Sequence, residues 1–197
     1  MIGVEAAWVG FVVVTLAAAV FSVLPRLGPV VRAVPAAVIV LGALALTAFD
    51  VRPAPPSTVL GTLAALSVAL LGIVAGSAVT NAALRLSTRT TIPAGTHGGI
   101  LVVASSGPAA RGATATGATP TTKEVLRGGA AIGDLERFAV IGAAAIGHLE
   151  LIAAVIAIKG LGRFSELDSA EARERFIVGT LTSMLWAGAA AAAVLLP

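Results

Sequence analysis

Cysteine is absent from this chain of 197 residues, and charged side chains make up only 12% of it. Without cysteine the chain can form no disulfide, no thiolate metal site and no cysteine nucleophile. The two histidines are too few to hold a metal by themselves, and no His-Glu-x-x-His spacing is present, so we expect neither a metal nor another cofactor. Soluble domains carry roughly 25% charged residues, so the low charge excludes an ordinary soluble globule.

Apolar residues make up 57% of the chain, and its mean hydropathy is +0.99. This composition predicts an integral membrane protein of the cell membrane, with the lipid bilayer as its expected partner. The net charge of +3 does not indicate a nucleic-acid binder, because the basic residues are scattered singly with almost no aromatic side chain among them. We expect them to hold loop ends at anionic headgroups.

Five apolar runs are long enough to cross a bilayer core of about 30 Å, which needs ~20 residues of helix. They cover about residues 4–24, 30–49, 58–84, 138–158 and 176–196. The sequence therefore predicts an all-α, polytopic transmembrane helix bundle of about five spans in a single membrane domain. The first run is kept as a permanent span, because its only early charge is Glu5 and no cleavage motif precedes Pro25.

A polar segment at about residues 86–128 separates the third run from the fourth. Its Ser, Thr, Gly and Pro content predicts a flexible loop with a short strand-like or surface-adsorbed piece at 99–104. Thr121 and Glu124 have capping-box spacing, which predicts a short helix leading to residue 128.

The loop charges give a weak preference for one orientation. Seven Lys or Arg residues lie beside the spans on one side and five on the other. By the positive-inside rule this count favours an external N-terminus and a cytoplasmic C-terminus.

Small residues recur every four positions on two of the predicted helices. Gly72 and Gly76 share a face of the third, and Gly179 and Ser183 share a face of the fifth. Such stripes let helix backbones approach closely, either inside the chain or at the seam of a homo-oligomer.

The fourth run carries charge at its centre, where it is costly and marks a functional site or a partner contact. His148 and Glu150 lie near its middle, and helical spacing places His148 on one stripe with Arg137 and Lys159. Glu136 and Glu150 share a different stripe. Glu150 and His148 therefore form either a proton or cation relay or a set of interhelical hydrogen-bonding partners.

The last third of the chain resembles the C-terminal membrane block of a family of uncharacterised bacterial integral membrane proteins. The matching residues lie between about 129 and 187, in four groups: Ile132-Gly133-x-Leu135-Glu136-Arg137, Gly147-x-x-Glu150, Ala157-x-Lys159-x-x-x-Arg163-Phe164 and Val178-Gly179-Thr180-x-x-Ser183. The family has no assigned activity. The resemblance thus implies importance for these residues without a chemical role: Glu136, Arg137, Glu150, Lys159, Arg163 and Ser183.

Three functions remain open from the sequence. The first is a packing, accessory or complex-forming membrane component, which would not be an enzyme. The second is a small proton- or cation-coupled transporter that uses Glu150 near the membrane midplane. The third is an intramembrane enzyme acting on a lipid-linked substrate, whose phosphate would be engaged at the interface by Glu136, Arg137, Lys159 and Arg163.

Overall fold

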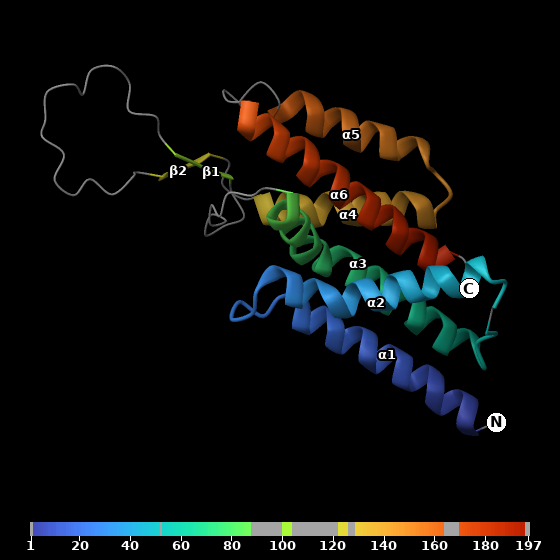
Figure 1. Ribbon diagram of the computed structural model, residues 1–197. Helices are drawn as coiled ribbons and strands as arrows, with labels where there is room; N and C mark the ends of the chain where they lie inside the picture. Colours follow the sequence, from blue (N-terminus) through green and yellow to red (C-terminus); the bar gives the residue numbers. More distant parts are fainter. Residues whose placement is uncertain are drawn as a thin grey trace, which may run out of the picture.

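A computed structural model describes residues 2–51, 53–87, 100–103, 122–125, 129–163 and 170–195. Within these ranges the chain forms six helices and one pair of short strands (Figure 1). In chain order the elements are α1 (Ile2–Ser22), α2 (Pro29–Ala48), α3 (Thr58–Ser87), β1 (Ile100–Val103), β2 (Thr122–Val125), α4 (Gly129–Ala145), α5 (Glu150–Arg163) and α6 (Ala170–Leu195).

The predicted all-α class is confirmed. Among the described residues, four helices are long and apolar enough to cross a membrane: Gly3–Ser22, Pro29–Ala48, Thr58–Ser87 and Ala172–Leu195. They correspond to the predicted runs at 4–24, 30–49, 58–84 and 176–196. The remaining predicted span, 138–158, is not one helix.

A turn at residues 146–149 divides that predicted span into α4 and α5. Gly147 has a φ of +77°, a left-handed conformation that favours glycine. The His148 N–H donates to the Ala143 carbonyl at 2.8 Å, and the Gly147 N–H donates to the Ala144 carbonyl at 3.1 Å. These two bonds are those of a Schellman motif, which ends α4 and turns the chain back. The expected continuous helix is therefore replaced by a helical hairpin.

Helix α3 is the centre of the bundle and packs against α1, α2, α4 and α6 (Figure 1). Gly72 lies next to Ala190, whereas Gly179 lies next to Thr80, so α3 and α6 run antiparallel. The first turn of α1 and the last turn of α6 lie at the same end of the bundle, on the right in Figure 1. The sequence prediction placed these two ends on opposite sides, because it counted α4 and α5 as one crossing.

The bundle core is built mostly from alanine and other small side chains. One cluster joins α1, α2, α3 and α6 around Leu71, Ala75 and Trp186. Another joins α3, α4 and α6 around Ile141 and Ala190. Small residues let the helices approach closely, which is how helices associate where the solvent is itself apolar.

The described part of the long connection consists of β1 and β2, which pair antiparallel with Ile100 opposite Val125. The strand-like piece expected near 99–104 corresponds to β1. The short helix expected from the Thr121–Glu124 spacing is wrong, since Thr122–Val125 is a strand paired with β1. The rest of the predicted loop 86–128, apart from the last residues of α3, lies outside the described residues.

Candidate functional site: a polar cluster around Arg137

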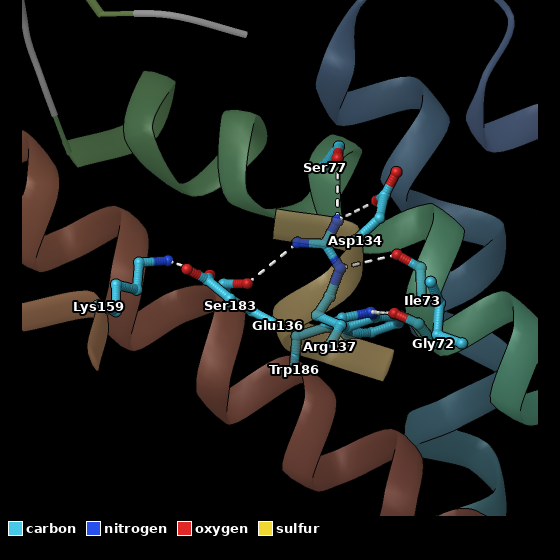
Figure 2. A network of polar contacts seen from close by, with 9 residues as sticks. All are labelled: Gly72, Ile73, Ser77, Asp134, Glu136, Arg137, Lys159, Ser183 and Trp186. Atoms are coloured by element: carbon cyan, nitrogen blue, oxygen red, sulfur yellow. Dashed lines mark hydrogen bonds and ion pairs between the residues drawn. The ribbon is translucent and has the colours of Figure 1, made fainter. Parts of the chain in front are cut away.

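The candidate site lies halfway along the membrane-spanning helices. Arg137 of α4 contacts Ile73 of α3 and Ser183 of α6 (Figure 2). Ile73 is 15 residues from the start of the Thr58–Ser87 span and 14 from its end, and Ser183 is 11 and 12 residues from the ends of Ala172–Leu195. The guanidinium group of Arg137 is therefore held near the middle of both spans.

Arg137 is only 2% exposed, and four hydrogen bonds hold its guanidinium group in place. Nε donates to the Ile73 carbonyl at 2.7 Å and Nη1 donates to the Ser183 hydroxyl at 3.0 Å. Nη2 donates to the Ser77 hydroxyl at 3.0 Å and to the Asp134 carboxylate at 2.5 Å. These groups, from α3, α4 and α6, are called the Arg137 cluster below. A buried cation needs both a counter-charge and acceptors, and the cluster supplies both.

Glycine makes room for this guanidinium on the surface of α3. A Cβ placed on Gly76 would lie 2.6 Å from Cζ of Arg137 and closer still to its Cδ and Nε. On α4 itself, a Cβ on Gly133 would lie 3.2 Å from Nη1. The guanidinium group thus lies against the backbone of α3, which explains why glycine occupies position 76.

Asp134 is the counter-charge of Arg137 and the most accessible part of the cluster. Its side chain is 47% exposed, whereas that of Arg137 is 2% exposed. The two residues are three positions apart on α4 and so lie on the same helix face. The Asp134 carboxylate neutralises the Arg137 guanidinium. It lies on the side of Arg137 that is nearer to the start of α4.

A second ion pair joins the two arms of the hairpin. The Lys159 ammonium of α5 donates to the Glu136 carboxylate of α4, and both side chains are largely buried (Figure 2). Since Glu136 is adjacent to Arg137 in sequence, this pair lies at a similar depth in the bundle. Three buried charges, those of Arg137, Glu136 and Lys159, and the half-exposed charge of Asp134 therefore form two neutral pairs, the arrangement expected where water is scarce.

The sequence had indicated that His148 and Glu150 lie in the middle of a helix, and the structure places them elsewhere. They occupy the turn between α4 and α5, where Nδ1 of His148 and Oε1 of Glu150 are 2.7 Å apart and the side chains are 60% and 70% exposed. A hydrogen bond from the Glu150 backbone N–H and one from His148 hold the pKa of the Glu150 carboxyl below its usual range. The Glu150 carboxyl is therefore exposed and paired with His148 rather than buried.

The small residues predicted for helix packing have contacts within the chain. A Cβ on Gly72 would lie 2.5 Å from Cβ of Ala190 and 3.0 Å from Cδ1 of Ile141, so α3, α4 and α6 meet there. A Cβ on Gly179 would be in ordinary contact with Thr80, at 3.6 Å. Ser183 belongs to the Arg137 cluster. The side chain of Arg163 lies outside the described part of the chain.

Three members of this region were not found by sequence reasoning: Asp134, Ser77 and Trp186. Asp134 is three residues before Arg137, a spacing that indicates an ion pair on a helix. Ser77 is one of several hydroxyl-bearing residues on the third predicted span, so nothing in the sequence pairs it with Arg137. The Trp186 indole N–H donates to the Gly72 carbonyl at 2.7 Å, a bond that no local pattern indicates (Figure 2).

The chemistry available to the cluster is hydrogen bonding and charge neutralisation. Within the described residues, no group of three or more His, Asp or Glu side chains is arranged to hold a metal ion. The donors of Arg137 and the ammonium of Lys159 are directed at acceptors of the chain itself.

Comparisons with protein-family models, with curated proteins and with solved structures find no match for this chain.

Proposed function

We propose that this membrane protein is an accessory or complex-forming component whose intramembrane polar residues hold its helices together, rather than a transporter or an enzyme. The observation that carries the proposal is the guanidinium of Arg137, which bonds α3, α4 and α6 at mid-depth. Hydrogen bonds between membrane helices each contribute about 0.6 kcal/mol on average and up to about 1.7 kcal/mol. Three of the four bonds of Arg137 run to other helices, to Ile73 and Ser77 of α3 and to Ser183 of α6, so Arg137 is the residue best placed to fix the hairpin in the bundle.

The positions of the other charges support the same proposal. A transporter built on Glu150 needs that carboxylate near the midplane, whereas Glu150 lies at the exposed turn of the hairpin. An enzyme acting on a lipid-linked phosphate needs free cations, whereas Arg137 and Lys159 are paired with Asp134 and Glu136. The charges that lie deepest are thus engaged in holding helices.

Proteoliposomes containing the full chain test the proposal. With a pH-sensitive dye inside, and separately with sodium or potassium gradients, the wild type and Glu150→Gln should show no ion flux above protein-free vesicles. The matched variant Glu136→Gln keeps a hydrogen-bonding amide at the buried pair and should likewise show no ion flux. Flux in the wild type that either variant abolished would overturn the proposal.

A stability measurement on the same preparations supplies the positive result. Ser183→Ala removes one acceptor of Arg137, and we expect its free energy of unfolding to fall by about 0.6–1.7 kcal/mol. Thr180→Ala is the control, since Thr180 lies on the same helix and has no described part in the cluster. Equal stability of the two variants would contradict a helix-holding role for the cluster.

A further inference from the structure

The α4–α5 hairpin carries apolar side chains that no described part of the chain covers. Phe138 of α4 is 63% exposed, and on α5 Leu151, Ile156 and Ile158 are 47%, 47% and 73% exposed. We call these four residues the outer face of the hairpin. From Leu151 to Ile158 α5 contains no charged or polar side chain at all. Such a surface continues the apolar exterior of α1, α2 and α3, where many Val and Leu side chains are similarly exposed.

The depth of the hairpin follows from its contacts with the spanning helices. Arg137 is level with the middles of α3 and α6, and Ala145 is eight residues farther along α4. At 1.5 Å per residue the turn lies about 12 Å beyond mid-depth, close to the half-thickness of a hydrocarbon core of about 30 Å. This position explains why an exposed His148–Glu150 pair is tolerated there, because it reaches the polar headgroup layer.

The basic residues are distributed very unevenly between the two ends of the bundle once the hairpin is recognised. Of thirteen Lys and Arg residues, Arg52 belongs to the connection between α2 and α3, while Arg137 and Lys159 lie within the bundle. The other ten belong by sequence to helix ends and connections at the opposite end, which we call the basic end. Ten against one is a strong positive-inside signal, unlike the seven against five obtained when α4 and α5 are counted as one span.

We propose that the α4–α5 hairpin inserts into the bilayer from the cytoplasmic side, with lipid hydrocarbon covering its outer face and its turn in the external headgroup layer. The first turn of α1 and the last turn of α6 are then at the external side, and the basic end is cytoplasmic. Hydrocarbon is the occupant that fits the outer face, because the two interior charges of the hairpin nearest to it, Glu136 and Lys159, neutralise each other. In the turn, backbone N–H groups donate to carbonyls of the hairpin itself, as a membrane environment requires; they are those of Ile146, Gly147, His148, Leu151 and Ile152.

Single-cysteine variants of the full-length chain test this proposal directly, because the natural sequence contains no cysteine. Leu149→Cys marks the turn, Ile156→Cys the outer face, Ala54→Cys the connection between α2 and α3, and Leu24→Cys the basic end. A membrane-impermeant maleimide is added to intact cells or spheroplasts and then to permeabilised ones. We expect Ala54→Cys and Leu149→Cys to react in intact cells, and Leu24→Cys only after permeabilisation. Ile156→Cys should stay at the level of the cysteine-free parent in both.

Each other outcome overturns the proposal in a recognisable way. Reaction of Leu149→Cys only after permeabilisation would place the whole hairpin on the cytoplasmic side, and no reaction in either case would place the turn in hydrocarbon. Reaction of Ile156→Cys with the water-soluble reagent would show a wet outer face. A disulfide-linked dimer of Ile156→Cys in the membrane would show that a second copy covers it. This pattern of labelling is independent of ion flux and of helix stability, so it can fail while the proposed function stands.

Discussion

Replacing Gly76 by alanine should separate α3 from α4, because the guanidinium of Arg137 occupies the space of the new methyl group. A Cβ at this position would lie 2.6 Å from Cζ of Arg137, whereas ordinary contacts begin at 3.4 Å. Relieving the clash moves that carbon by at least 0.8 Å. The bonds from Nε to Ile73 and from Nη2 to Ser77, now 2.7 and 3.0 Å, would then reach about 3.5 and 3.8 Å, at or beyond the useful limit.

Loss of these two bonds gives the expected magnitude. At about 0.6–1.7 kcal/mol each, their loss lowers the free energy of unfolding by about 1–3 kcal/mol. Glycine-to-alanine changes in a helix also add stability of up to about 1 kcal/mol, so a matched control is needed. Gly142→Ala on α4 provides it, since a Cβ there meets nothing within 4 Å.

The comparison is made on purified full-length protein in bicelles, by denaturation with increasing SDS followed by tryptophan fluorescence. Gly142→Ala should be as stable as the wild type or slightly more stable, and Gly76→Ala should be about 1–3 kcal/mol less stable than Gly142→Ala. If the two alanine variants unfold together, the guanidinium does not pack against α3 as described, and the reasoning fails.

Three further changes test other parts of the bundle. Gly147→Ala should destabilise the hairpin by about 1 kcal/mol in thermal unfolding, because alanine disfavours the left-handed φ of +77°, and an unchanged melting temperature would argue against the Schellman turn. Trp186→Phe removes the hydrogen bond to the Gly72 carbonyl together with part of a buried ring, so it should cost at least about 0.6–1.7 kcal/mol; no loss would mean that this bond does not stabilise the bundle. Lys159→Met leaves the Glu136 carboxylate buried without its cation and should be less stable than the double variant Lys159→Met/Glu136→Gln, whereas equal stability would contradict a buried pair.

The spanning helices were accessible to sequence reasoning because their signal is length and hydropathy. Four of the predicted runs correspond to uninterrupted helices that are long and apolar enough to cross a membrane, and each run is bounded by proline or charge. The break in the fourth run, 138–158, was missed because the average hydropathy of that run is that of a span. Gly147, followed by His148, was the available sign, since glycine just before a polar residue is typical of a helix C-terminus.

The pairing of charges could be predicted only in part, and the reason is geometric. A helical wheel drawn through residues 134–159 separates a basic stripe from an acidic one, which is valid only if the helix is continuous. Once the chain turns back at Gly147, Lys159 returns to the level of Glu136, 23 residues earlier, and the apparent stripes become an ion pair across the hairpin. Asp134 and Arg137, by contrast, lie three residues apart on one helix, so their contact needed no tertiary information.

The single turn at Gly147 therefore accounts for both the arrangement of charge and the orientation we propose. A continuous helix would leave Glu150 and His148 near the midplane without partners, and would send the Lys and Arg residues beyond Lys159 to the opposite side. The hairpin instead carries Glu150 and His148 to an exposed turn, matches Glu136 with Lys159, and returns Arg173 and Arg175 to the end where the other basic residues gather. Arg137 is then the cation that remains deepest, and its acceptors come from α3, α4 and α6 of the same chain. The chain has few charged residues, and Arg137, a deeply buried cation, is bonded to acceptors on three helices. This arrangement favours a protein that holds helices together over one that moves an ion through them.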